Sequence, residues 1–129
     1  MSYESRDVEI IPIPGPSSLT SAISICGFNM QEFRFYGFLP HKKGRQTKIK
    51  EIVASETPVV LFESKYRILK LLEELEKFDI QKRRQIVVCN DLTKKFERVY
   101  RGTFDEVLQE IKKEEPKGEF VIIIDRFYS

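Results

Sequence analysis

The stretch Pro12-Ile13-Pro14-Gly15-Pro16-Ser17-Ser18 decides how the chain is organised. It joins an apolar run, Val8 to Ile13, to a run with helical periodicity, Leu19 to Cys26. Its three prolines hold φ at about −65° and remove three amide donors, whereas Gly15 can adopt a positive φ. The two serines place hydroxyls at a helix start, where unpaired amides favour a polar or anionic partner. The stretch therefore predicts a rigid strand-to-helix turn, either as the edge of a ligand site or as a well-made turn alone.

The composition indicates one folded domain. The chain has 129 residues with 41% hydrophobic residues, 10 Phe and no Trp. These values suit a single core, and no run approaches the roughly 20 apolar residues of a membrane span. The start of the chain is polar and lacks the apolar region of a secretory signal. Cys26 and Cys89 lie in apolar runs without metal-type spacing, which predicts two reduced, buried thiols and a cytoplasmic location.

The charges are distributed unevenly, although the net charge is only +2. Five of the ten residues from His41 to Lys50 are Lys or Arg, and none of the ten is acidic. Further basic clusters lie at 82–84 and 94–101. Such patches favour a polyanionic partner, with an ordinary solvated surface as the alternative.

The order of periodic segments predicts an α/β fold. Apolar or alternating runs predict strands at 8–13, 33–39, 57–62, 84–89, 96–101 and 120–124. Helical spacing predicts helices at 19–26, 46–55 and 68–78, and a fourth that begins at 104 and continues to Pro116-Lys117-Gly118. Because strands and helices alternate, we expect a mixed sheet of about five strands with helices on both faces. The segment 96–101 is expected near a sheet edge.

Local signals mark the ends of these helices. Gly27 stands where a left-handed C-terminal cap is wanted. Thr103 and Glu106 have the spacing of a capping box. Ser64 is the expected N-cap of the helix at 68–78, and the polar loop 41–46 is expected to be exposed.

Polar residues follow three of the apolar runs, at 14–18, 63–67 and 90–95. Ligands of open α/β sheets bind beyond the carboxyl ends of strands, so these residues are candidates for a site. Glu63 and Arg67 could supply a site carboxylate and an anion-binding guanidinium, or could pair and cap the next helix.

Few other residues of the sequence are candidates for a catalytic or binding role. Lys94 and Lys95 are candidate phosphate contacts or a solvated turn. His41 lies among cations, which disfavour its protonated form, and no metal-ligand spacing occurs. Glycine-rich nucleotide motifs and a nucleophile elbow are missing from the sequence.

Five motifs occur in an order and spacing that resemble a known family. They are Pro12 to Ser18, Gly37-Phe38-Leu39-Pro40 with a following basic run, Phe62-Glu63-Ser64 with Arg67, Leu92 to Glu97 with Arg101-Gly102-Thr103, and Gly118-Glu119. Together they resemble the carboxyl-terminal half of the ribosomal RNA small-subunit methyltransferase I group, in the tetrapyrrole methylase superfamily. The resemblance spans residues 8–125.

The resemblance implies a fold, a reaction and a set of partners. Members of this group have two domains and are typically homodimers. They transfer a methyl group from S-adenosylmethionine to the ribose 2′-oxygen of a cytidine in small-subunit (16S) ribosomal RNA, with the cofactor in a cleft between the domains. The resemblance thus implies a domain of the tetrapyrrole methylase carboxyl-terminal type, which would act on ribosomal RNA or the 30S subunit without a membrane or a metal.

The resemblance also implies roles for individual residues. The implied cofactor-cleft residues are Gly15, Pro16, Ser17, Ser18, Phe62, Glu63, Ser64, Thr93, Gly102 and Gly118. The RNA-side candidates, chosen by charge and placement, are Lys42, Lys43, Arg45, Arg67, Lys94 and Lys95. Lys94 or Glu63 is the hypothetical group that orients or deprotonates the 2′-hydroxyl.

The chain departs from the group's pattern in three ways. Lys65-Tyr66 replaces a Pro-His pair, and Asn90-Asp91 replaces Arg-Glu. Residues 1–129 are expected to form a single domain of the carboxyl-terminal type, without the group's amino-terminal domain. We therefore expect this chain alone to be inactive and to need that amino-terminal domain as a partner. The alternatives are a non-enzymatic RNA-binding or dimerisation module and a small-molecule methylase of the tetrapyrrole type.

Overall fold

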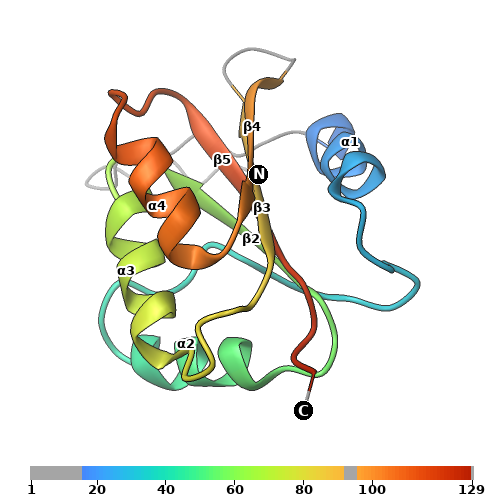
Figure 1. Cartoon of the computed structure of the whole chain (residues 1–129), viewed down its shortest axis with the longest axis vertical. Coiled ribbons are helices and arrows are strands. Elements are labelled where there is room, and N and C mark those ends of the chain that lie inside the picture. The colour runs from blue at the N-terminus through green and yellow to red at the C-terminus, as the bar shows by residue number, and fades with distance from the viewer. Residues whose placement is uncertain (1–15, 92–95, 129) are drawn as a thin grey trace, which may run out of the picture.

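The computed structural model describes residues 16–91 and 96–128, which form four helices and five strands (Figure 1). In chain order the elements are α1 (Pro16–Cys26), β1 (Arg34–Gly37), α2 (Arg45–Ala54), β2 (Val59–Ser64), α3 (Ile68–Phe78), β3 (Ile86–Asp91), β4 (Phe96–Gly102), α4 (Phe104–Lys112) and β5 (Glu119–Ile124). The predicted strand at 8–13 and the turn up to Gly15 lie outside the described residues. The other predicted strands and helices are confirmed, with shifts of one to three residues at most of their ends.

The five strands form one mixed sheet in the order β1-β2-β5-β3-β4. β1 runs parallel to β2, whereas β5 is antiparallel to both of its neighbours, β2 and β3. β4 is antiparallel to β3 and lies at the sheet edge, as predicted. Since β2 and β3 point the same way on either side of β5, their carboxyl ends meet the amino end of β5. We call this end of the sheet the carboxyl edge; it is the upper end in Figure 1.

Helices cover both faces of the sheet, as the alternation of strands and helices predicted. Along each central strand, successive side chains point to opposite faces. On one face, Val60, Val87 and Ile123 pack with Ala22 and Cys26 of α1. On the other face, a larger core forms between the sheet and α2, α3 and α4. Figure 1 shows α1 alone on one side of the sheet and the other three helices on the opposite side.

The helix ends follow local chemistry in some places and not in others. Gly27 has φ of 85° and closes α1, as predicted. Thr103 and Glu106 form the predicted capping box, in which the Thr103 hydroxyl accepts from the Glu106 amide at 3.2 Å and the Glu106 carboxylate from the Thr103 amide at 2.9 Å. The prediction that Ser64 caps α3 is wrong. Ser64 is the last residue of β2, paired with Glu119, and a turn separates it from α3.

The two cysteines are free and buried, as expected. Burial raises the pKa of the Cys89 thiol to about 12, so the thiol stays protonated and behaves as a small apolar group. Among the described residues, no helix is both long and apolar enough to span a bilayer.

Candidate functional site at the carboxyl edge

Two buried polar side chains lie in one row across the carboxyl edge. Glu63 of β2 is in register with Phe120 of β5, and Phe120 is in register with Asn90 of β3. Residues in register point to the same face, so Glu63 and Asn90 flank Phe120 on the face covered by α2, α3 and α4. Glu63 is 3% exposed and Asn90 5% exposed. Polar groups buried this deeply need partners, and those partners define the site.

The Glu63 carboxylate has an environment that favours its protonated form. One oxygen accepts a hydrogen bond from the Ser64 amide at 2.8 Å. Burial raises the pKa of the Glu63 carboxyl, while the Ser64 amide and the Arg45 and Arg67 guanidinium groups act in the opposite direction. A carboxylate of raised pKa is a better proton acceptor than an exposed one, as a general base requires.

Arg45, the first residue of α2, joins three segments beside Glu63. Its guanidinium makes an ion pair with Glu74 of α3, with one contact of 2.6 Å, and donates to the Pro40 carbonyl at 2.9 Å. The residue is only 4% exposed. This position corrects the expectation that the whole loop 41–46 is exposed, and it directs the guanidinium at Glu74 and Pro40 instead of at solvent. The sequence could not show this because Glu74 lies 29 residues away.

The exposed basic residues form the rim of this cluster. Arg67, just before α3, lies 3.1 Å from Nδ1 of His41. Partial burial and the Arg67 guanidinium lower the pKa of His41, the direction that its cationic surroundings predicted. Lys42 and Lys43 are exposed in the turn that leads into α2. Three of the RNA-side candidates therefore lie together at the carboxyl edge: Lys42, Lys43 and Arg67.

A second cluster surrounds Asn90 on the other side of Phe120. Tyr100 of β4 donates to Glu114 at 2.7 Å, and Arg98 makes an ion pair with the same carboxylate at 2.6 Å. Burial and the Glu114 hydrogen bond raise the pKa of the Tyr100 phenol to about 12. Asn90 and this trio line a pocket of about 290 Å³. Asn90 is the first of the polar residues 90–95, and its place directly after the apolar run 86–89 was the signal for it in the sequence.

The cofactor candidates divide between the two faces of the sheet. Phe62 points toward α1 and makes edge-to-face contacts with Phe35 and Phe38, at ring-centre distances of 5.2 and 5.7 Å. Ser64 also alternates to that face, whereas Glu63 points to the other. Gly118, with φ of 68°, precedes β5 at the same edge. Pro16 and Ser17 open α1, and Ser18 is buried in its first turn.

Gly102 does not lie with the other candidates. It pairs with Ile86, the first residue of β3, because β4 runs antiparallel to β3 and returns to the opposite edge. Five residues of strand separate Ile86 from Asp91, or about 16 Å. Gly102 has φ of 146°, and a Cβ there would lie 2.7 Å from Oε1 of Glu106. Its placement is thus explained by the capping box of α4. Gly15, Thr93, Lys94 and Lys95 lie outside the described residues.

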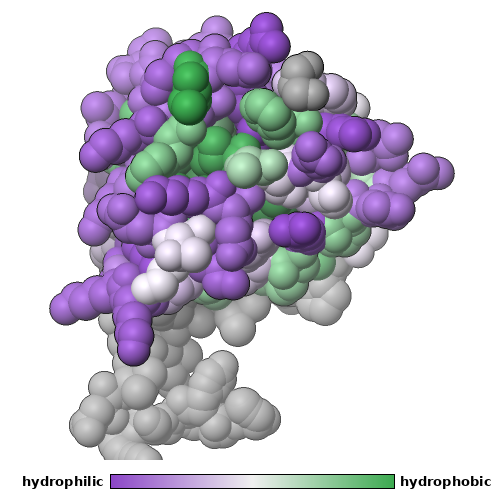
Figure 2. All heavy atoms as spheres, turned by 90° about the horizontal axis from the view of Figure 1, so that it is seen from below, coloured by the Kyte–Doolittle hydropathy of each residue, from purple (hydrophilic) through white to green (hydrophobic). Residues whose placement is uncertain are grey.

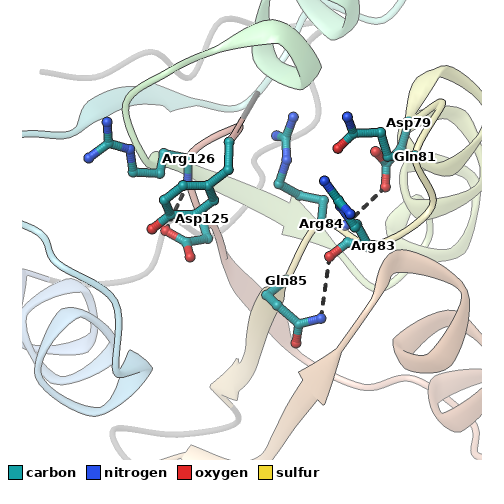
Figure 3. A pocket seen from close by; sticks show the side chains of 8 residues that line it. Asp79, Gln81, Arg83, Arg84, Gln85, Asp125 and Arg126 are labelled. Atoms are coloured by element: carbon teal, nitrogen blue, oxygen red, sulfur yellow. Dashed lines mark hydrogen bonds between the residues drawn. The ribbon is translucent and has the colours of Figure 1, made fainter.

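The opposite edge holds a different buried cation, Arg84, in the pocket of Figure 3. Its guanidinium donates to the Val53 carbonyl and stacks on the Phe127 ring at 5.2 Å, and its amide donates to Asp79 at 3.3 Å. Among the described residues Nη1 has no hydrogen-bond partner, and burial lowers the pKa of Arg84. An apolar hollow of about 450 Å³ adjoins it, and Figure 2 shows apolar side chains interrupting the polar surface as seen from below.

Fold and site together define a class of protein. The model of the tetrapyrrole (corrin/porphyrin) methylases matches residues 2–108 of the chain. The chain therefore belongs to the tetrapyrrole methylase family. A cobalamin biosynthetic enzyme, cobalt precorrin-4 methyltransferase, has a similar fold, with a TM-score of 0.60 over 92% of this chain and 52% of that one; the two are 14% identical.

Curated relatives narrow the family to a methyltransferase group. The chain is 32% identical over 117 residues to the ribosomal RNA small subunit methyltransferase I of Thermotoga maritima. The aligned stretch covers 91% of this chain and 52% of the relative. It is 36% identical to the protein of that name from Buchnera aphidicola subsp. Acyrthosiphon pisum (94% and 44% covered) and 33% identical to that from Helicobacter pylori (92% and 43% covered). The chain thus resembles methyltransferases named for small-subunit ribosomal RNA, and it spans about half the length of these relatives.

Proposed function

We propose that this chain is the substrate-side domain of an S-adenosylmethionine-dependent methyltransferase that modifies the ribose 2′-oxygen of a cytidine in small-subunit ribosomal RNA. The observation that carries the proposal is the match, over nine-tenths of the chain, to relatives named for methylation of that RNA. The exposed cations beside the carboxyl edge suit an RNA substrate better than a small apolar one.

The carboxyl edge supplies groups that fit one side of such a cofactor. Phe62 gives an aromatic group on the α1 face, and Ser64 gives a small polar group at the same strand end. When bound, S-adenosylmethionine would supply an electrophilic methyl group. Since the chain spans about half of its relatives, the rest of the cleft would come from a companion domain corresponding to their remaining length.

Within this proposal Glu63 receives the proton of the 2′-hydroxyl, directly or through water, as the oxygen takes the methyl group. Its raised pKa suits that task. Arg45 acts as a positioning residue, because its bonds to Glu74 and Pro40 tie the start of α2 to α3 and to the β1–α2 loop beside Glu63. Lys94 remains the alternative group for the hydroxyl. Lys42, Lys43 and Arg67 would contact RNA phosphates, which positions the substrate without reading its sequence.

The test is methyl transfer to 30S particles that lack the modification, with labelled S-adenosylmethionine. We expect no incorporation by the 129-residue chain alone, because misplacing reacting groups by about 1 Å can cost about 100-fold in rate. We expect incorporation when the chain is fused to the complementary part of the Thermotoga maritima relative, with the label recovered in 2′-O-methylcytidine. Turnover by the chain alone would remove the need for a companion domain, and label on a base would contradict ribose methylation.

A further inference from the structure

We propose that the pocket beside Asn90 binds a single nucleobase that displays an N–H donor on its edge. The inference rests on the proposed function, within which this base is that of the target nucleotide. The pocket lies at the carboxyl edge, on the face covered by α4, and has a volume of about 290 Å³.

The shape and lining of the pocket suit a small flat ring. Phe120 and Ile111, each 1% exposed, form the apolar floor of the pocket, and Pro116 adds an apolar side wall. The volume is at or below the lower limit for drug-sized ligands, so it accommodates one base better than a whole dinucleotide. Two acidic residues, Glu114 and Glu115, and two basic residues, Arg98 and Lys117, line the pocket. Their charges balance, so they do not define an anion site.

Asn90 is a buried polar group in this pocket that retains hydrogen-bonding capacity. Its Nδ2 donates to the Lys117 carbonyl at 2.8 Å, which fixes the orientation of the carboxamide. Within residues 16–91 and 96–128, no hydrogen bond is made by its Oδ1 or by its second N–H. Neither atom is among the fully enclosed atoms without a partner. This oxygen is therefore open to a hydrogen bond from a ligand or water that enters the pocket.

Three neighbouring polar side chains, those of Tyr100, Arg98 and Glu114, are already engaged. Tyr100 and Arg98 both bind Glu114, and the Arg98 guanidinium lies 5.5 Å from the centre of the Tyr100 ring. These contacts hold the wall of the pocket in place. An Asn carboxamide that presents both an acceptor and a donor matches the edge of a base, as in Asn–adenine pairs and in bases extruded from a stack.

The position of the pocket relative to Glu63 agrees with this assignment. Asn90 and Glu63 are two strand spacings apart in the same row, or about 10 Å between their Cα atoms. A nucleotide can bridge such a separation. A base held at Asn90 would therefore place its ribose on the side of the carboxyl edge where Glu63 lies.

The test is an NMR titration of the 129-residue chain with cytidine 5′-monophosphate, using ribose 5-phosphate as the ligand without a base. We expect the nucleotide to shift the Asn90 side-chain amide signals and the backbone signals of Lys117 and Phe120, and the sugar phosphate to leave them unchanged. Asn90→Ala should weaken binding about fivefold, the effect of one hydrogen bond of about 1 kcal/mol. Asn29→Ala, a matched change of an exposed residue on the other side of the sheet, should bind like the wild type.

A second variant keeps the test decisive if Asn90→Ala does not fold. Glu115→Trp fills the mouth of the pocket from an exposed position and should abolish the shifts. Equal shifts with ribose 5-phosphate, or undiminished binding by a folded Asn90→Ala or Glu115→Trp variant, would overturn the proposal. The readout needs neither S-adenosylmethionine nor the 30S particle. If the nucleotide binds in this pocket but methyl transfer is not observed, the result therefore supports the pocket and contradicts only the proposed function.

Discussion

Arg84, at the edge opposite the carboxyl edge, is buried in a different way from Glu63 and Asn90 at the carboxyl edge. At the end opposite the carboxyl edge, Arg84 binds Val53 of α2, the α3–β3 connection and the Phe127 ring of the C-terminal tail. At the carboxyl edge, the hydrogen bonds of Glu63 and Asn90 go to backbone groups, the Ser64 amide and the Lys117 carbonyl. Arg84 therefore joins separate segments, whereas the other two polar groups occupy positions that the backbone already fixes.

This difference separates structural from functional burial. A polar group whose partners come from several segments contributes to the stability of the whole fold. A polar side chain that is held only by backbone groups at a strand end can be substituted with little loss of stability. Its substitution would instead remove a chemical group from the site. Four substitutions test that distinction, and they are given in decreasing order of their expected effect.

Arg84→Ala should lower the free energy of unfolding by about 4 kcal/mol. The change leaves the Val53 carbonyl without its donor, removes the stacking on the Phe127 ring and deletes a buried side chain, which are among the changes that give the largest losses of stability. Urea unfolding measures the effect. The exposed neighbour Arg83 provides the control, and Arg83→Ala should change stability by less than about 0.5 kcal/mol. Equal effects for the two variants would show that Arg84 is not a structural clamp.

Gly102→Ala should cost about 2–3 kcal/mol. A side chain at φ of 146° is strained, and the new Cβ would push the Glu106 carboxylate out of the capping box. Gly44→Ala is the matched control, since Gly44 has φ of 83° with no atom within 4 Å of an added Cβ, and it should cost only about 1 kcal/mol. Thermal unfolding of both variants distinguishes them. A Gly102→Ala variant as stable as Gly44→Ala would contradict the structural role of this glycine.

Glu63→Gln should leave the fold intact and slightly stabilise it at pH 7. Because burial raises the pKa of Glu63 above 4.5, the folded state holds that proton at a higher pH than the unfolded state does. The free energy of unfolding of the wild type should therefore rise relative to that of Glu63→Gln as the pH falls through the pKa of Glu63 in the folded state. Below about pH 4.5 the two proteins should no longer differ in this way. Denaturant unfolding across this range measures it, with the exposed Glu56→Gln as control. A large loss of stability at pH 7 would make Glu63 a structural residue like Arg84.

Arg67→Ala should raise the pKa of His41 toward 6.5 without a measurable change in stability. The Arg67 guanidinium lies 3.1 Å from Nδ1 of His41 and disfavours a second positive charge there. His41 is the only histidine, so its ring signal can be followed alone in an NMR titration. Lys65→Ala removes a neighbouring exposed cation and should shift the titration less. An unchanged His41 titration in Arg67→Ala would show that the contact does not persist in solution.

The sequence predicted those features that depend on nearby residues. The capping box of Thr103 and Glu106, the glycine cap of α1 and the edge position of β4 were all expected and all occur. Ser64 has the chemistry of an N-cap, but pairing with Glu119 keeps it in the strand. Arg45 has the sequence context of an exposed loop, but Glu74 and Pro40 bind its guanidinium. In both cases a distant segment overrides a local preference.

The sequence by itself determined the alternation of strands and helices, the polar strand ends and the family, because periodicity and motif spacing are properties of the chain. Only the tertiary structure decided which of the polar strand ends come together. Antiparallel β5 between β2 and β3 places Glu63 and Asn90 in one row, while the return of β4 carries Gly102 to the opposite edge. Strand order and direction are set by packing over the whole core, and so the site emerges only once the sheet is assembled.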